Sequence, residues 1–237
     1  MMSKKNLSGM RLFSQGAIDT LPLILAAVPF GILYGVLAKA SGLSAWATMG
    51  MSLLVYAGSA QFIAVGMLAA SVAWPAILLT TFFVNLRHIL YAATLVPYVR
   101  HWPNRLRAPA AFWLTDESFA VVSNWLRKNP EQSGMPWYYF GSGVLMYVNW
   151  LLCSWVGLTL GESLPGLDSL GLEVAMIVAF VGIIAPALIG LPMILTAVSA
   201  SLCGIFTWGW PNQSGLMVSA LMGVIVGVIA EKVSDDE

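Results

Sequence analysis

Long apolar runs recur along the whole chain and constrain its fold more than any other feature. Of the 237 residues, 59% are hydrophobic and only 9% are charged, whereas an average soluble domain has about 25% charged residues. A membrane-spanning helix needs about 20 consecutive apolar residues. The pattern predicts an all-α polytopic integral membrane protein with about seven transmembrane segments. The runs lie at Ala17–Leu37, Trp46–Ala70, Trp74–Tyr98, Trp137–Leu160, Leu172–Ile189, Leu191–Trp208 and Leu216–Ala230.

The basic residues are distributed unevenly between the loops, and this sets the expected orientation. The N-terminal tail and the segments Arg100–Arg107 and Arg127–Lys128 are basic, whereas Gly161–Gly171 contains acids and no basic residue. Three full crossings before Arg100 would place that basic loop outside. A second run that is broken or re-entrant removes the conflict. We therefore expect both termini in the cytoplasm.

Short connections between the runs leave no room for a second folded domain. Residues 17–230 are expected to form a single transmembrane domain. Residues 1–16 and 231–237 then form the cytoplasmic N-terminal and C-terminal tails.

The second apolar run contains small and polar residues where a lipid-facing helix would carry Leu or Ile. Irregular backbone at membrane depth is tolerated where it lines a cavity or packs in protein, and discontinuous helices commonly form transporter substrate sites. Close helix packing through Gly and Ser is the alternative. A buried carboxamide needs a partner, which favours the first interpretation. We expect a break near Gly58 and Ser59 and name as candidate site residues Tyr56, Gly58, Ser59 and Gln61.

A charged cluster lies deep in the third run. If Trp74–Tyr98 is one helix, Arg87 lies about 18 Å from either end, too deep for its side chain to reach the interface. Intramembrane arginines face a bundle interior or an aqueous cavity and commonly mark a solute or proton pathway. A helical wheel places the polar residues of this run within about 160° of arc. The candidate site residues are Asn85, Arg87, His88 and Tyr91; a purely structural ion-pair network is the alternative.

Two acids provide the natural partners of Arg87. The segment Ala108–Leu126 is less apolar than the runs and carries Asp116 and Glu117 at its centre. If this segment is instead an interfacial amphipathic helix, both acids are merely solvated. His88 can change charge near neutral pH, so it is a further candidate for a proton relay.

Several function classes are excluded or disfavoured by composition. The formal net charge of zero provides no basic field to attract phosphates, so no nucleic-acid partner is expected. Cys153 and Cys203 lie inside apolar stretches and imply neither a disulfide framework nor a metal site. No catalytic motif is present. We therefore expect a protein that is not an enzyme and that needs no cofactor.

The three polar motifs together resemble the AzlC family, the large subunits of bacterial branched-chain amino acid exporters. The order and spacing of the motifs match, as does the chain length. The resemblance is strong over the N-terminal half and extends to the C-terminal half only in hydropathy. The motifs are Tyr56-Ala57-Gly58-Ser59-Ala60-Gln61-Phe62, Asn85-Leu86-Arg87-His88-Ile89-Leu90-Tyr91 and Leu114-Thr115-Asp116-Glu117-Ser118-Phe119-Ala120.

This resemblance implies a specific biochemical role. It implies proton-driven export of valine, leucine, isoleucine and often methionine across the bacterial inner membrane, together with a small AzlD-like membrane subunit. Some family members carry an acid where Asn85 stands. Its absence leaves His88, Asp116 and Glu117 as candidates for the coupling residue.

A channel-like solute conductor is the main alternative, because a broken helix and Arg87 could also serve as a selectivity element. An intramembrane enzyme ranks last, since no paired nucleophile and base can be named.

Overall fold

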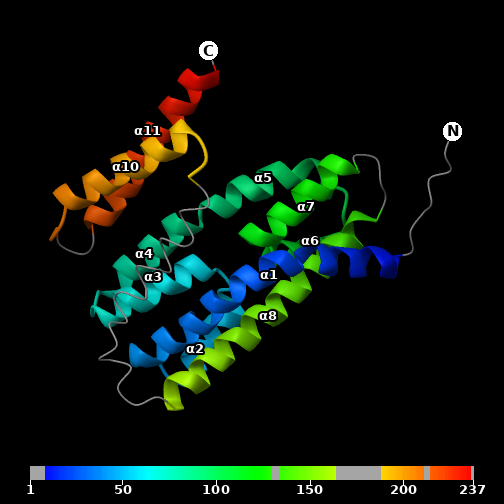
Figure 1. The fold of residues 1–237 in the computed structure, drawn as a ribbon, viewed down its shortest axis with the longest axis horizontal. Coiled ribbons are helices and arrows are strands. Elements are labelled where there is room, and N and C mark those ends of the chain that lie inside the picture. The colour runs from blue at the N-terminus through cyan, green and yellow to red at the C-terminus, as the bar shows by residue number, and fades with distance from the viewer. Residues whose placement is uncertain (1–8, 130–133, 164–187, 211–213, 236–237) are drawn as a thin grey trace. The chain divides into compact units, whose positions relative to one another are not determined.

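The computed structural model describes residues 9–129, 134–163, 188–210 and 214–235, and confirms the all-α class in that part of the chain. Figure 1 shows the helices in chain order. They are α1 (Gly9–Ala40), α2 (Ala45–Leu54), α3 (Gly58–Ala69), α4 (Trp74–Asn85), α5 (Arg87–Val99), α6 (Asn104–Phe112), α7 (Asp116–Lys128), α8 (Met135–Ser163), α10 (Leu191–Phe206) and α11 (Ser214–Asp235).

Three stretches of the described residues are long and apolar enough to cross a membrane: Gly9–Ala40, Trp74–Val99 and Met135–Gly161. The helices α2, α3 and α10 are apolar but shorter. The prediction of a polytopic membrane protein is thus supported, whereas the expected number of about seven segments stays a prediction. The predicted run Leu172–Ile189 lies outside the described residues, apart from its last two.

The chain divides into two compact units, and the first comprises Met1–Phe62 and Asn85–Asp168. Its two longest helices, α1 and α8, pack side by side (Figure 1). Glycines allow this contact, because a Cβ on Gly35 would lie 2.2 Å from the Ser154 carbonyl oxygen and one on Gly157 would lie 1.9 Å from that of Ile32. Any larger side chain at either glycine would force the two backbones apart.

An aromatic core joins α5, α6 and α7 to this helix pair. The rings of Trp125 on α7 and Tyr138 on α8 stack with centroids 4.7 Å apart. The hydroxyl groups of the buried tyrosines are paired: Tyr139 donates to the carbonyl oxygen of Ala110 at 2.6 Å, and Tyr138 donates to Asp19 at 2.7 Å. The core therefore fixes the position of α7, on which both candidate acids lie.

The second unit comprises Ile63–Val84 and Ser169–Glu237. Within it, α10 and α11 pack against each other through small side chains. A Cβ on Gly223 would lie 3.1 Å from the Ala200 side chain, and one on Gly227 would lie 2.3 Å from the Thr196 hydroxyl. No residue of α10 is buried, so the described part of this helix offers no enclosed polar site.

The second apolar run is broken, as predicted. Helix α2 ends at Leu54 and α3 begins at Gly58, so the irregular backbone covers residues 55–57. Tyr56 lies in the left-handed region with φ 42°, a conformation that a side chain with a Cβ adopts only under strain. Its amide donates to the carbonyl oxygen of Met51 at 3.2 Å and closes the end of α2.

The third run differs from the expected single helix. Its helical hydrogen bonding is interrupted at Leu86, between α4 and α5. The amide of Ile89 donates to the carbonyl oxygen of Leu86 at 2.9 Å, which tightens the turn. The His88 imidazole lies 3.0 Å from the freed carbonyl oxygen of Asn85. The His88 side chain thus competes with a backbone amide for the Asn85 carbonyl oxygen, which disfavours the regular helical hydrogen bond.

The segment Ala108–Leu126 comprises parts of two helices. Helix α6 ends at Phe112, and α7 begins at Asp116. Thr115 and Ser118 form a reciprocal capping box at the start of α7, which satisfies backbone amides that would otherwise lack partners. The two acids therefore lie at a helix N-terminus, where the helix dipole favours negative charge, and not at a helix centre.

Candidate functional site

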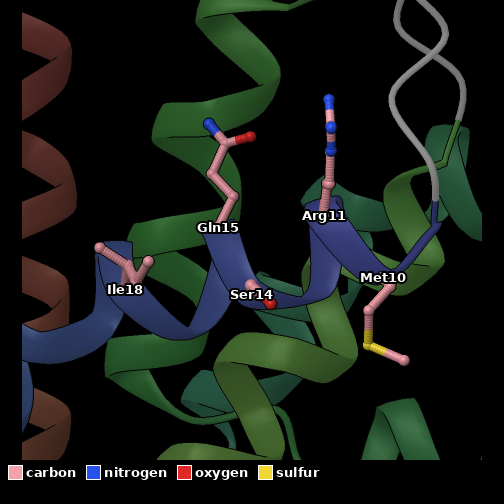
Figure 2. A pocket seen from close by; sticks show the side chains of 5 residues that line it. All are labelled: Met10, Arg11, Ser14, Gln15 and Ile18. Atoms are coloured by element: carbon pink, nitrogen blue, oxygen red, sulfur yellow. The ribbon is translucent and has the colours of Figure 1, made fainter.

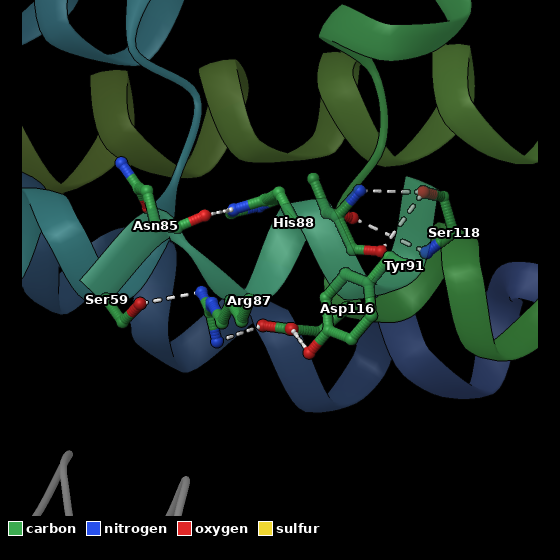
Figure 3. Close-up of polar contacts among 8 residues, drawn as sticks. Ser59, Asn85, Arg87, His88, Tyr91, Asp116 and Ser118 are labelled. Carbon is green, nitrogen blue, oxygen red and sulfur yellow. Dashed lines mark hydrogen bonds and ion pairs between the residues drawn. The ribbon is translucent and has the colours of Figure 1, made fainter. Parts of the chain in front are cut away.

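Arg87 forms the centre of a polar cluster in the first unit (Figure 3). One guanidinium nitrogen, Nη1, lies 2.7 Å from the Asp116 carboxylate. The other, Nη2, donates to the Ser59 hydroxyl at 2.6 Å. The predicted pairing of Arg87 with an acid is therefore confirmed. One side chain joins the first turns of three helices, α3, α5 and α7.

The Asp116 carboxylate is held from two sides. The Tyr91 hydroxyl donates to its second oxygen at 2.5 Å, and the Tyr91 ring stacks on Phe119 with centroids 4.5 Å apart. The ion pair is not enclosed, since the Arg87 side chain is 28% exposed and that of Asp116 is 41% exposed. A partly open ion pair of this kind can exchange one partner for a ligand at a smaller penalty than a fully buried one.

Three buried polar atoms around this cluster have no hydrogen-bond partner in the part of the chain that the structure describes. They are the Tyr56 hydroxyl, the side-chain oxygen of Asn85 and Nε of Arg87. Buried polar groups are nearly always paired, and an unpaired group calls for an explanation such as a ligand that the site receives. These atoms comprise hydrogen-bond donors and an acceptor. An amino acid, which has a carboxylate and an ammonium group, presents the complementary set.

Glu117 adjoins the cluster without joining the ion pair. It is partly buried and forms no ion pair in the described part of the chain. Helix α7 lies outside the three long apolar stretches. Burial raises the pKa of the Glu117 carboxyl, and Asp116 raises it further, whereas Thr115 and Arg87 act in the opposite direction. This carboxyl therefore binds a proton at a higher pH than an ordinary one.

The structure places Gln61 in a separate network behind the break. Its amide nitrogen donates to the Ser52 hydroxyl at 3.2 Å, and its oxygen accepts from the Trp150 indole at 3.1 Å. Ser52 in turn donates to Ser154 at 2.8 Å. Ser59 and Gln61 are two residues apart on α3 and so point to nearly opposite helix faces.

Gly58 belongs to the same side of α3 as Gln61. A Cβ on Gly58 would lie 3.0 Å from the Trp150 ring, so the glycine allows the start of α3 to approach α8. The predicted site residues thus divide into two groups: Ser59, Asn85, Arg87, His88, Tyr91, Asp116 and Glu117, with Tyr56 beside them, and Gly58 with Gln61.

The sequence analysis missed the residues that complete the Gln61 network. Ser52, Ser154 and Trp150 lie in apolar runs and carry no motif. Their only signal is that Ser52 lies nine residues before Gln61 on the other half of the broken run, which no local pattern reveals. Phe62, the last residue of the first motif, is buried with its ring edge-on to Tyr34, 6.1 Å between centroids.

A surface hollow of about 290 Å³ lies along the first turns of α1 and contains none of the predicted site residues. Figure 2 shows its lining side chains on successive turns of this one helix. They are Met10, Arg11, Ser14, Gln15 and Ile18. The hollow is therefore a separate feature from the cluster around Arg87.

Comparison with known proteins decides the family. The model of the AzlC protein family matches residues 22–164, more than half of the chain and all three polar motifs. The chain belongs to the AzlC family. No solved structure matches the chain.

Three curated relatives of this AzlC family member are bacterial proteins. An uncharacterized membrane protein of Haemophilus influenzae is 31% identical over 70% of the chain and 67% of its own length. The inner membrane protein YgaZ of Escherichia coli is 29% identical over 66% and 64% of the two chains. The branched-chain amino acid transport protein AzlC of Bacillus subtilis is 26% identical over 68% and 62%. The matched segments thus span about two thirds of these relatives.

Proposed function

We propose that this protein is the large subunit of a secondary transporter that exports branched-chain amino acids, coupled to the proton gradient and acting with a small AzlD-like membrane subunit. The observation that carries the proposal is the position of Arg87 between Ser59 at the helix break and Asp116. The name of the Bacillus subtilis relative, a branched-chain amino acid transport protein, supports the choice of substrate. The two breaks and the unpartnered polar atoms support a ligand site at the cluster.

The substrate carboxylate binds at the start of α3 in this proposal. The first turn of a helix leaves amide groups without an intrahelical acceptor and carries a partial positive charge. Gly58 and Ser59 provide such amides. Nε of Arg87 has no partner and adds a charged donor, which makes the strongest type of hydrogen bond to a carboxylate.

The substrate ammonium binds on the opposite side of the cluster. The carboxylates of Asp116 and Glu117 and the unpartnered oxygen of Asn85 are its acceptors. Tyr91 acts on the ammonium indirectly, because its hydroxyl fixes the orientation of Asp116.

The aliphatic side chain packs against aromatic rings beside the break. The ring of Tyr56 meets that of Tyr147 edge-on with centroids 4.8 Å apart, and Phe112 lies 6.0 Å from Tyr56. Phe112 is also 40% exposed, so part of this apolar surface is free to contact a ligand. Such a surface discriminates aliphatic chains by only about 1–3 kcal/mol per methylene. Valine, leucine, isoleucine and methionine are therefore expected to compete with one another.

Both termini lie in the cytoplasm in this proposal, and α2 and α3 together enter and leave the bilayer from one side. The basic segments Arg100–Arg107 and Arg127–Lys128 support this orientation. Accessibility of single cysteines placed in each segment to a membrane-impermeant thiol reagent tests it. Labelling of Arg105→Cys from the periplasmic side in intact cells would reverse the assignment.

Efflux from loaded membrane vesicles tests the transport function. Vesicles that contain the protein and the small subunit should release labelled leucine faster when a proton gradient is imposed, and each omission should slow release. Release that is rapid, passive and indifferent to the gradient would favour the channel-like alternative. Unlabelled valine should compete with leucine, whereas lysine and glutamate should not; equal competition by either charged amino acid would contradict the apolar site.

A further inference from the structure

The two adjacent acids of α7 differ in their surroundings. Asp116 is paired with Arg87 at 2.7 Å and accepts a second bond from Tyr91. Glu117 forms no ion pair in the described part of the chain. The Arg87 and Asp116 charges offset each other, which leaves Glu117 as the acid of the cluster that no cation neutralises among the described residues.

A second feature points to the same carboxyl. The Tyr56 side chain is 5% exposed, and its hydroxyl has no partner in hydrogen-bonding geometry. The Glu117 carboxyl lies within electrostatic range of that hydroxyl, and the Thr115 hydroxyl is a neighbouring hydrogen-bonding group. A buried phenol without a hydrogen-bond partner is unusual, and here it lies beside an acid that forms no ion pair among the described residues.

We propose that Glu117 is the coupling residue, at which a proton and the substrate ammonium compete for one carboxylate. This inference rests on the proposed export function. Each of the two ligands brings one positive charge to Glu117, so the carboxylate is neutralised by either but holds only one at a time. The proton binds a carboxylate oxygen, and no other bond is made or broken. Mutually exclusive binding is what an exporter needs if protons entering the cell are to drive amino acids out.

The neighbouring titratable groups do not provide an equivalent site. The Tyr91 phenol lies within electrostatic range of Asp116, Arg87 and Glu117. The Tyr56 phenol lies within electrostatic range of Tyr139 and Tyr147. Phenols are neutral in the physiological range, and a proton on Asp116 would disrupt its ion pair with Arg87. His88 lies against the carbonyl oxygen of Asn85. Glu117 is therefore the carboxyl of this set that can gain a proton without disrupting an existing ion pair.

Leucine exchange in proteoliposomes, measured across a pH series with equal pH on both sides, tests the inference. The vesicles contain the full chain and the small subunit. In the wild type, the apparent KM for leucine should rise as pH falls, by up to about tenfold per pH unit below the pKa of the coupling carboxyl, because proton and ammonium compete. Glu117→Gln should give a higher KM that no longer varies with pH, and it should lose the acceleration of efflux by a proton gradient.

Two further variants complete the test. Glu231→Gln changes an exposed acid of α11 and should retain the wild-type pH dependence. Tyr56→Phe removes a potential donor to the Glu117 carboxylate and should move the midpoint of the KM dependence to higher pH, which provides a test if Glu117→Gln does not fold.

The outcomes separate this inference from the function on which it rests. Absence of leucine exchange in the wild type would refute the transport function. Exchange with a wild-type pH dependence in Glu117→Gln, or an unmoved midpoint in Tyr56→Phe, would overturn the assignment of Glu117 alone. Loss of the pH dependence in Asp116→Asn but not in Glu117→Gln would assign the proton to Asp116 instead.

Discussion

The first unit contains two polar clusters on opposite faces of α3, and they differ in how completely their hydrogen bonds are formed. The Gln61 network is fully buried, and its amide nitrogen and oxygen are both paired. The Arg87 cluster is partly exposed and leaves the Tyr56 hydroxyl, the Asn85 oxygen and the Arg87 Nε unpaired. Buried polar groups whose hydrogen bonds are all formed within the protein thus stabilise its structure. We infer ligand binding where buried polar groups lack a hydrogen-bond partner.

The largest effect is expected from removing the centre of the open cluster. Arg87→Ala should reduce leucine efflux below detection, because Asp116 loses its cation and the substrate loses a charged donor. Arg87→Lys should restore little activity, since an ammonium cannot contact Ser59 and Asp116 with the same fork geometry. Transport and the amount of protein in the membrane are both measured, and the exposed Arg127→Ala serves as the control. Normal efflux in Arg87→Ala would remove the cluster from the mechanism.

The closed network should respond through stability. Gln61→Leu removes the acceptor of the Trp150 indole and the donor to the Ser52 hydroxyl. Each buried polar group left without a partner costs about 1–3 kcal/mol. The Tm in detergent should fall by about 5 °C. Gln15→Leu on the surface hollow of α1 is the matched control and should change the Tm little. A Gln61→Leu protein with unchanged Tm but no transport would show that this network also serves the substrate directly.

An intermediate effect on affinity is expected from Asn85. Its side-chain oxygen has no partner among the described residues, so Asn85→Leu should not lower the Tm. The variant should raise the KM for leucine by about tenfold, since a hydrogen bond to a charged group contributes about 1.5 kcal/mol. A large fall in Tm with unchanged KM would place Asn85 with the structural network and weaken the comparison.

The smallest effect is expected from Ser59. Arg87 keeps its contact with Asp116 when the Ser59 hydroxyl is removed, so Ser59→Ala should raise the KM for leucine only about threefold. Ser59→Thr retains the hydroxyl and should recover the wild-type value. A loss as severe as that of Arg87→Ala would mean that Ser59 contacts the substrate itself.

Local rules predicted much of this architecture. Apolar length and composition gave the all-α membrane class, and the small and polar residues around Gly58 located the break in the second run. One local feature was wrong in form, because the third run, expected as one helix, is interrupted at Leu86. The sequence analysis also did not predict that Asp116 begins a helix. The Thr115 and Ser118 capping box was present in the sequence but lacked the usual Glu or Gln at its last position.

The sequence by itself determined which residues are polar at membrane depth, because burying such residues in an apolar run is unfavourable enough to mark each of them. It could not determine which of them share a site. Ser59 and Gln61 carry the same local signal, yet one contacts Arg87 and the other Trp150. That division depends on contacts between helices far apart in the chain, which only the tertiary structure decides: a hydrogen bond needs a partner within about 3 Å and at a suitable angle, and neither condition is visible in the order of the residues.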